Sequence, residues 1–254
     1  MRIYAVIPAR YDSTRFPGKP LAIIAGKPMI RHVYQCAAAC PEISEVFVAT
    51  DDERILQKVT DFGGKAIMTG KKHQSGTDRI AEALQTLHLE DKDLIVNIQG
   101  DQPLFKPDVI SKMVAPLIEN TDISMGTLKF RITDEKDITN PNIVKVITDK
   151  EGFAIYFSRS TIPFYRDTDL NSVYFKHLGL YVYRKDFLMK FSSLPCGELE
   201  SAEKLEQLRA IENGFKIKVV ETDTNSLEVD IPEDIRKIEE AIAGSLKNPG
   251  LPIN

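Results

Sequence analysis

Runs of β-branched and aromatic residues recur along the first half of the chain, separated by longer segments of mixed polarity. Three of these runs lie at residues 3–7, 46–50 and 94–98. Short apolar runs that alternate with helical patterns are typical of parallel strands joined by crossover helices. The first half therefore predicts an α/β arrangement built on a parallel sheet.

The segments between these runs carry apolar residues at helical spacing. One predicted helix begins after Pro28, a favoured residue at a helix start. Its apolar stripe comprises Met29, Ile30, Val33, Ala37 and Cys40. A second predicted helix begins after Asp52 and ends before Gly63 and Gly64. Its stripe comprises Ile55, Leu56, Val59 and Phe62. Both segments are predicted to be crossover helices.

The pattern changes in the second half. Residues 143–148 and 153–157 flank the polar turn 149–152 and predict a β-hairpin. Further helices are expected near residues 201–213 and 232–243, on either side of a strand at 216–220. We therefore expect one domain over 1–254 with a mixed sheet.

Composition and charge narrow the function classes. The chain has 254 residues, 43% of them hydrophobic, and a formal net charge of −4. It therefore has no general basic field, and we expect no binding to nucleic acid or to a membrane surface. Three cysteines at irregular spacing suit a reducing compartment. We expect no signal peptide, because Arg2 leads directly into the short strand-like run 3–7, which Pro8 follows. We expect a cytoplasmic protein.

The connection after the first predicted strand is rich in phosphate-binding groups. Between Pro8 and Pro20 it contains three cations and several small or hydroxyl residues, namely Arg10, Ser13, Thr14, Arg15, Gly18 and Lys19. In parallel α/β sheets, ligands bind beyond the carboxyl ends of the strands, and such groups can hold a triphosphate. Neither the P-loop nor the G-x-G-x-x-G motif is present, which argues against a P-loop ATPase or a dinucleotide dehydrogenase.

This segment, IPARYDSTRFPGKPL at 7–21, resembles the N-terminal signature of the 3-deoxy-manno-octulosonate (KDO) cytidylyltransferases. The resemblance continues in family order through GKPMI at 26–30, ATD at 49–51, HQSGT at 73–77, NIQGD at 97–101, YFSR at 156–159, HLG at 177–179, LEQLR at 205–209 and VDIPED at 229–234. It implies a Rossmann-like nucleotidyltransferase fold that forms CMP-KDO and pyrophosphate from CTP and KDO, for lipopolysaccharide synthesis.

The resemblance also implies a division of the chain. Residues 1–130 would mainly bind CTP, residues 131–230, which contain the hairpin, would mainly serve sugar binding and dimerisation, and residues 231–254 would form a C-terminal helix and tail. A homodimer is expected. The nucleotide contacts implied in this way are Pro8, Ala9, Arg10, Ser13, Arg15, Lys19, Gln74, Ser75, Gly76 and Gln99. Arg10 and Lys19 would also act in catalysis, with Lys19 facing the leaving pyrophosphate.

Two aspartates are candidate metal ligands. Asp101 follows a predicted strand, which puts its carboxylate at the same sheet edge as the basic loop. Asp230 precedes a predicted helix start at Pro232, so from the residues alone it could equally be a helix cap. Mg²⁺ bound to a nucleotide takes one or two protein carboxylates. The resemblance implies that Asp101 and Asp230 are catalytic and hold Mg²⁺.

One position departs from the family pattern. Gln102 follows Asp101 where many KDO enzymes have glutamate, so one negative charge near the metal is missing. The natural sugar could therefore be KDO or its 8-amino analogue, with sialic acid a less favoured alternative. A glycosyltransferase would share the architecture but release a nucleoside diphosphate, and the paired aspartates argue against a non-enzymatic nucleotide sensor.

The sugar contacts implied by the resemblance lie in the second half. They are Arg159, His177, Tyr181, Glu206 and Gln207. Arg159 could offer a bidentate guanidinium to the sugar carboxylate. His177 and Tyr181 lie four residues apart in a predicted strand and should share a face. Glu206 and Gln207 flank the apolar stripe of the helix expected at 201–213, a place where polar residues are usually solvated.

Overall fold

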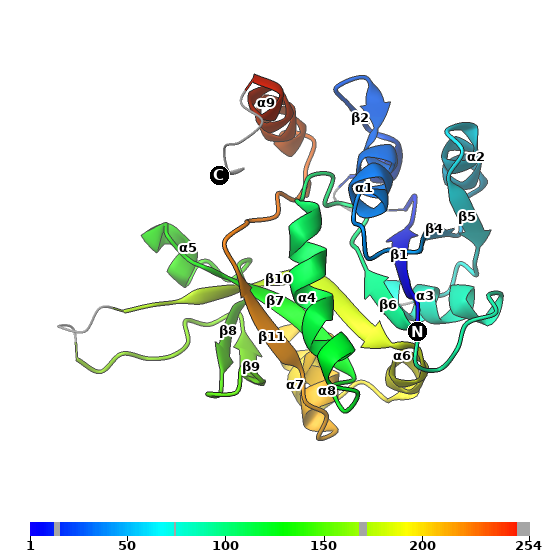
Figure 1. Cartoon of the computed structure of the whole chain (residues 1–254). Helices are drawn as coiled ribbons and strands as arrows, with labels where there is room; N and C mark the ends of the chain where they lie inside the picture. Colours follow the sequence, from blue (N-terminus) through cyan, green and yellow to red (C-terminus); the bar gives the residue numbers. More distant parts are fainter. Residues whose placement is uncertain (13–15, 74, 168–171, 248–254) are drawn as a thin grey trace.

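A mixed, mostly parallel β-sheet forms the centre of the molecule (Figure 1). The computed structural model describes residues 1–12, 16–73, 75–167 and 172–247. In sheet order the main strands are β11 (Lys218–Thr222), β7 (Met125–Arg131), β10 (Phe175–Arg184), β6 (Leu94–Asn97), β1 (Ile3–Ala9), β4 (Glu45–Thr50) and β5 (Lys65–Met68). Strands β8 (Lys145–Thr148) and β9 (Ala154–Ser158) form a hairpin attached through β10.

The order of the strands locates a ligand-binding edge. Strand β1 pairs in parallel with β4 and with β6, and β4 pairs in parallel with β5. The chain thus runs from β1 outward through β4 and β5 and then crosses to β6 on the other side of β1. This reversal makes the carboxyl ends of β1 and β6 a topological switch point, where open α/β sheets bind ligands. Strand β10 is antiparallel to both of its neighbours, β6 and β7.

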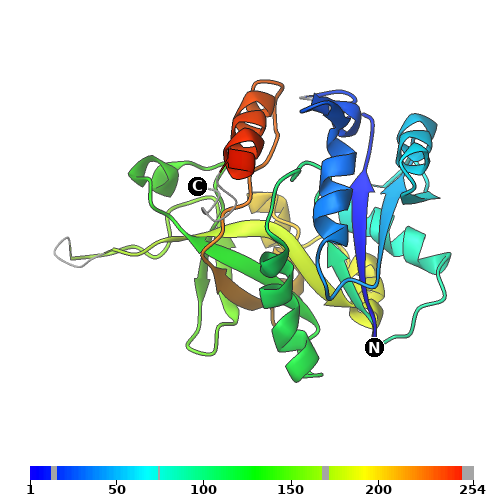
Figure 2. The ribbon, with the colours of Figure 1, turned by 45° about the horizontal axis from the view of Figure 1, so that its top comes forward.

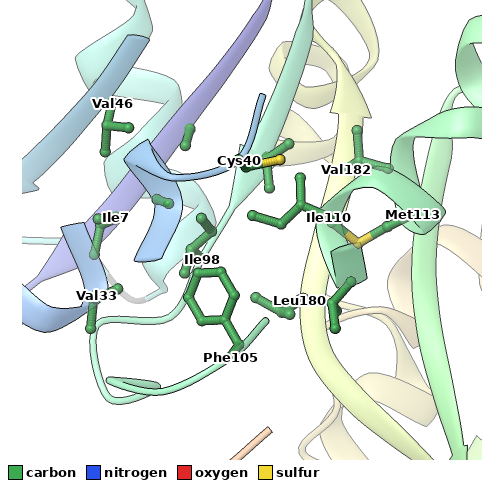
Figure 3. Packing of buried hydrophobic residues seen from close by; sticks show 14 of the residues in the cluster. Ile7, Val33, Cys40, Val46, Ile98, Phe105, Ile110, Met113, Leu180 and Val182 are labelled. Atoms are coloured by element: carbon green, nitrogen blue, oxygen red, sulfur yellow. The ribbon is translucent and has the colours of Figure 1, made fainter. Parts of the chain in front are cut away.

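Helices cover both faces of the sheet because alternate strand residues point to opposite sides. In β1, Ile3, Ala5 and Ile7 join one core cluster, whereas Tyr4 and Val6 join the other. The first cluster packs against α1 (Met29–Ala38), α2 (Glu53–Asp61) and α4 (Pro107–Glu119). The second packs against α3 (Gly76–Gln85), α6 (Lys185–Ser193) and α8 (Leu208–Glu212). The close view of the first cluster shows Ile110 and Met113 of α4 near Val182 (Figure 3).

The remaining elements lie at the edges of this core. They are the 3₁₀ helix η1 (Lys19–Leu21), the two-stranded pair β2 (Ile23–Ile24) and β3 (Lys27–Pro28), α5 (Glu135–Thr139), α7 (Glu198–Glu203) and α9 (Asp234–Lys247). Helix α9 buries Ile238 in the first cluster, and its Glu239 accepts a hydrogen bond from the Ala25 N–H. Within the described ranges, no helix combines the length and the apolarity that crossing a membrane requires.

The observed fold confirms most of the elements expected from the pattern. The three apolar runs are β1, β4 and β6, the segments after Pro28 and Asp52 are α1 and α2, and the hairpin is present. Helix α2 is capped by Asp52, whose carboxylate accepts the Arg54 N–H. The α/β architecture with a mixed, mostly parallel sheet expected for the chain is thus confirmed.

One expected element is wrong. Residues 201–213 do not form a continuous helix, because α7 ends at Glu203 and Lys204 adopts a left-handed conformation with φ of 54°. The Arg159 guanidinium binds the carbonyl oxygens of Glu203 and Lys204, which satisfies acceptors left without partners at a helix end. A buried ion pair between Arg209 and Glu200, with contacts of 2.6 and 2.7 Å, then holds α8 against α7.

The packing of β7 against α4 and β10 yields a stability prediction. A Cβ atom on Gly126 would lie 2.9 Å from Val182 Cγ1 and 3.0 Å from Leu117 Cδ1. We expect Gly126→Ala to lower the free energy of unfolding by about 1–3 kcal/mol, because the core must shift to admit the methyl group. Urea denaturation measures this change.

Gly244→Ala in α9 is the matched control. A Cβ there meets no atom within 4 Å, so the same substitution should leave stability unchanged or raise it by up to about 1 kcal/mol through helix propensity. Equal urea midpoints for the two variants would contradict the packing argument.

Candidate active site

The end of β1 is approached closely by two other segments, and glycines permit both contacts. A Cβ on Gly100, after β6, would lie 2.9 Å from the Pro8 carbonyl oxygen. A Cβ on Gly76, the first residue of α3, would lie 3.1 Å from Pro8 Cγ and 3.9 Å from Gln99 Oε1. The tertiary structure therefore brings together Pro8, Gly76 and Gln99, three of the predicted nucleotide contacts.

Helix α3 directs its N-terminus to this place. Ser75 caps the helix, since its hydroxyl accepts the Asp78 N–H at 3.1 Å. The N-terminal end of a helix favours negative charge, which suits a phosphate group. Ala9 is buried at the end of β1, and Arg10 is exposed just beyond it. Three predicted nucleotide contacts, Ser13, Arg15 and Gln74, lie outside the described residues.

Lys19 connects segments that are remote in sequence. Its ammonium donates to Asp101 Oδ2 at 2.7 Å and to the Val229 carbonyl oxygen at 2.9 Å. The Val229 N–H in turn donates to the Asp101 carbonyl oxygen at 2.9 Å. Asp230 is the next residue along the chain. The structure thus gathers Lys19, Asp101 and the segment of Asp230 at the switch point, although they are separated by about eighty residues or more in the sequence.

The helix after Asp230 starts later than the sequence predicted. Helix α9 begins at Asp234 rather than at Pro232. The side chain of Asp234 itself turns back and accepts the N–H groups of Asp230 and Ile231 at 3.0 and 3.1 Å. These two hydrogen bonds to Asp234 fix the bend of the backbone at Asp230 and Ile231.

The oxygens gathered here suit a hard divalent cation. They already hold a cation, because the Lys19 ammonium is bound by the Asp101 carboxylate and by the Val229 carbonyl oxygen. Within the described ranges, no group of three or more His, Cys, Asp or Glu side chains is arranged to hold a metal on its own. A metal held by Asp101 and Asp230 would therefore complete its shell with phosphate oxygens and water, as nucleotide-bound Mg²⁺ does.

A third carboxylate lies beside the two aspartates and explains the departure at Gln102. The Gln102 side chain is 1% exposed, and its Nε2 donates to Glu228 Oε1 at 2.8 Å. A glutamate at position 102 would instead set two carboxylates against each other. The pKa of Glu228 is raised by loss of solvent and by the nearby charges of Asp101 and Asp230. Residue 228 thus places a carboxyl group beside position 102, and the raised pKa means that this group ionises less readily than an exposed glutamate.

His177 and Tyr181 share a face of β10, as the period-two pattern predicted. Their ring centroids are 5.3 Å apart. Thr127 lies on the neighbouring strand β7, with its hydroxyl 2.7 Å from the Leu180 carbonyl oxygen and 3.0 Å from His177 Nε2. Because the single hydroxyl proton is directed to the carbonyl, we assign the Nε2–H of His177 as the donor to Thr127. Nδ1 is then the acceptor of the ring.

Burial keeps both of these side chains uncharged. Desolvation lowers the pKa of His177 well below its usual range, and it raises the pKa of Tyr181 above its usual range. A neutral imidazole with an accepting Nδ1 suits a sugar hydroxyl better than a carboxylate. The nearby Gly179 faces Gln102 and Gln99, since a Cβ there would lie 3.7 Å from Gln102 Nε2 and 3.9 Å from Gln99 Cγ.

Glu206 and Gln207 do not lie on the flanks of a helix, contrary to what the expected helix 201–213 implied. They lie in the turn between α7 and α8, and Gln207 is 5% exposed. Thr77 donates to Glu206 Oε2 at 2.6 Å, which joins this turn to the N-terminus of α3. Among the described residues, neither Glu206 Oε1 nor Gln207 Nε2 has a hydrogen-bond partner, although both atoms are buried. The pair therefore offers one acceptor and one donor to a polar ligand.

Arg159 is held by hydrogen bonds between its side chain and backbone carbonyl oxygens and between its own carbonyl oxygen and a lysine. Its guanidinium donates to the carbonyl oxygens of Glu203 at 2.7 Å, Pro141 at 2.9 Å and Lys204 at 3.4 Å. The fully buried Lys145 ammonium donates to the Arg159 carbonyl oxygen at 2.7 Å. The role of Arg159 in holding the sugar carboxylate stays a prediction, and in this structure the side chain organises the loop beside α7.

Several residues of the site were missed by the sequence reasoning. Glu228 had a visible signal, since it alternates with Asp230 in a strand-like run and should share its face. Thr77 follows Ser75 at a helix start, where hydroxyl groups usually cap the helix rather than reach another element. Lys145 gave no signal, because an isolated lysine in a strand is normally exposed.

Known proteins that are similar to this chain in sequence are cytidylyltransferases. The family described as cytidylyltransferase matches residues 4–219. A 3-deoxy-manno-octulosonate cytidylyltransferase of Geobacter sulfurreducens is 54% identical over 252 residues, covering 95% of this chain and 100% of the relative. One of Desulfatibacillum aliphaticivorans is 54% identical over 239 residues, covering 94% of this chain and 98% of the relative.

Solved structures are similar over the same extent. A CMP:2-keto-3-deoxy-manno-octonic acid synthetase complexed with CTP matches with a TM-score of 0.91 and 40% identity, covering 96% of this chain and 100% of that one. A 4-diphosphocytidyl-2C-methyl-D-erythritol synthase matches with a TM-score of 0.64 at 12% identity, covering 94% of this chain and 97% of that one. The second likeness extends to the fold alone.

The contacts of Arg159 generate a prediction. We expect Arg159→Lys to lower the free energy of unfolding by about 1.5–3 kcal/mol, because an ammonium cannot reach the same set of carbonyl oxygens as the planar guanidinium. Urea denaturation of the purified variant measures the loss.

Arg236→Lys on α9 is the matched control. Arg236 pairs with Glu240 on an exposed helix face, so its exchange should change stability by less than about 0.5 kcal/mol. If Arg159→Lys is as stable as this control, the guanidinium contributes nothing to folding, and a role in ligand binding alone would be favoured.

Proposed function

The chain belongs to the 3-deoxy-manno-octulosonate cytidylyltransferase family, and we propose that it transfers the cytidylyl group of CTP to KDO, giving CMP-KDO and pyrophosphate. The observation that carries this proposal is the similarity to a CMP:2-keto-3-deoxy-manno-octonic acid synthetase complexed with CTP, which extends over 96% of the chain at a TM-score of 0.91. The convergence of Lys19, Asp101 and Asp230 at the switch point supports it with chemistry suited to a triphosphate.

The nucleotide would lie across the ends of β1 and β6. Pro8, Ala9, Ser75, Gly76 and Gln99 surround this place. In the proposal Arg10, Ser13, Arg15 and Lys19 bind the phosphates, and Gln74 borders the nucleotide. The α3 N-terminus adds a favourable dipole for the negative charge. Binding would therefore be mainly electrostatic, with the triphosphate compensated by cations of the first loop.

The sugar would approach from the side of β10. Its anomeric oxygen attacks the α-phosphorus of CTP, the bond from that phosphorus to the bridging oxygen breaks, and the electron pair leaves with pyrophosphate. The hydroxyl proton passes to solvent, since no general base is assigned. Arg10 and Lys19 would offset the charge that develops on the phosphate oxygens, so catalysis rests on positioning and charge stabilisation.

We also propose that the enzyme depends on Mg²⁺ held by Asp101 and Asp230. Bound there, the ion would neutralise phosphate charge and lower the pKa of the attacking hydroxyl. The support is the pair of carboxylates at the switch point and the capacity of Asp101 to hold the Lys19 ammonium as a cation.

His177, Tyr181, Glu206 and Gln207 are proposed to form the polar wall of the sugar pocket, with Arg159 at its rim. Two features support this. Glu206 Oε1 and Gln207 Nε2 are buried and lack a hydrogen-bond partner among the described residues. The Thr77 hydrogen bond to Glu206 joins the turn that carries both residues to the α3 N-terminus, so the proposed sugar and nucleotide contacts adjoin.

The exposed apolar residues of the second half support the further proposal of a homodimer. Phe164 is 88% exposed and Ile155, on β9, is 53% exposed. The segment between β9 and β10 projects from the body of the protein in both views (Figures 1 and 2). An exposed aromatic side chain on this projection, with Ile155 exposed on β9, suits contact with a second copy.

We further propose that the enzyme works in the cytoplasm and supplies an activated sugar for lipopolysaccharide synthesis. Cys36, Cys40 and Cys196 are free thiols, which suits a reducing compartment.

Pyrophosphate release with CTP and Mg²⁺ tests the reaction. We expect the highest kcat/KM with KDO, measured beside its 8-amino analogue and sialic acid as separate sugars. Asp101→Asn and Asp230→Asn should each lower kcat by about a hundredfold or more, because each removes one carboxylate ligand.

The control for these variants is Asp122→Asn, an exposed aspartate before β7 that should leave kcat unchanged. Near-normal rates for both site variants with Mg²⁺ would refute the metal assignment. Absence of pyrophosphate release with KDO, together with release for another sugar, would refute the proposed substrate.

The oligomeric state tests the dimer. We expect Phe164→Ser to shift the protein toward a monomer in light scattering coupled to size exclusion, because it removes the most exposed apolar side chain among the described residues. Ile118→Ser on α4, at a residue 44% exposed, is the matched control and should leave the dimer intact. A monomeric wild-type protein at micromolar concentration would contradict the proposal.

A further inference from the structure

The Lys19 ammonium lies where it competes with a metal ion. It is 2.7 Å from Asp101 Oδ2 and 2.9 Å from the Val229 carbonyl oxygen, and its side chain is only 13% exposed. Asp101 is one of the two proposed metal ligands. A divalent cation on the same carboxylate would therefore sit close to a positive ammonium, and like charges repel most strongly where solvent is partly excluded.

The position of Lys19 also compensates negative charge in the absence of a ligand. Asp101, Glu228 and Asp230 lie together, since Gln102 next to Asp101 binds Glu228 and the Val229 N–H binds the Asp101 carbonyl oxygen. One ammonium between these segments offsets part of their repulsion. It also fastens the loop after β1 to both carboxylate-bearing segments, because it bonds to each of them.

A bound triphosphate offers the ammonium a different partner. Lysine carries a compact charge on a flexible four-carbon chain, so its ammonium can exchange one oxygen for another while the backbone stays in place. Phosphate oxygens near the end of β1 would draw Lys19 away from Asp101. The carboxylate oxygen would then become available at the moment when the phosphates supply the other ligands of the metal.

We propose that Lys19 is a cationic placeholder that closes the metal site until a nucleoside triphosphate binds. Metal and nucleotide then bind with positive coupling, and by thermodynamic reciprocity each raises the affinity for the other. This inference rests on the proposed function for the identity of the metal ligands, and it adds that Lys19 weakens metal binding to the nucleotide-free enzyme.

Binding of Mn²⁺ without nucleotide tests the placeholder. Free Mn²⁺ is titrated by electron paramagnetic resonance in the wild-type protein, Lys19→Gln and Lys19→Met. We expect both variants to bind Mn²⁺ roughly tenfold more tightly than wild type, because the competing charge is removed. Lys19→Gln retains a side-chain donor for Asp101 and Val229, so it tests charge even if Lys19→Met folds poorly. Lys27→Gln, at an exposed lysine, is the control and should match wild type.

Asp101→Asn combined with Lys19→Gln localises the effect and should abolish the gain. Thermal unfolding gives a second readout, in which Mn²⁺ should raise the Tm of Lys19→Gln more than that of wild type. Equal or weaker Mn²⁺ binding by both lysine variants, with binding still lost in Asp101→Asn, would overturn the placeholder and leave the metal site standing. Absence of Mn²⁺ binding in every variant would overturn the placeholder and the metal assignment, whereas the sugar-transfer reaction is judged separately by pyrophosphate release.

Discussion

The close approach of three backbone segments at the end of β1 is the constraint on which the rest of the site depends. Gly100 and Gly76 leave room that a methyl group would fill against Pro8. Because these contacts bring the segment after β6 and the first turn of α3 to the same strand end, Asp101 and the helix N-terminus can address one ligand. A parallel sheet with a switch point at β1 and β6 supplies the edge, and the two glycines bring its loops into contact.

Two contacts join Asp101 and Gln102 to the segment before Asp230, one made by a charged group and one by a neutral amide. On the nucleotide side, Lys19 bonds directly to Asp101 and to the carbonyl of Val229, so a single cation joins the two segments that bear the carboxylates. On the other side, Gln102 binds Glu228 through a neutral amide. A glutamate at position 102 would repel the Glu228 carboxylate, whereas the Gln102 amide donates a hydrogen bond to it. The two contacts fasten Asp101 to the chain around Asp230 from opposite sides.

Glu206 and Gln207 reach the site from a turn, whereas His177 and Tyr181 reach it from strand β10. Lys145 is fully buried and its ammonium satisfies the carbonyl oxygens of Asn140, Ile143 and Arg159. Desolvation lowers its pKa, and its three donors are all used. The loop so formed carries the Arg159 guanidinium against the end of α7, which turns the chain at Lys204 and leaves Glu206 and Gln207 beside Thr77.

The sequence by itself determined the elements whose signal is local. Apolar runs and helical stripes identified β1, β4, β6, α1 and α2, because the periodicity of a strand or a helix depends on neighbours in sequence. The motif string 7–21 identified the family, because its residues are consecutive in the chain. Only the tertiary structure decided the break at Lys204, the burial of Gln207, the partnership of Gln102 with Glu228 and the cation held by Asp101. Each of these depends on a contact between segments far apart in the chain, and no local pattern specifies which distant carbonyl or carboxylate a side chain will meet.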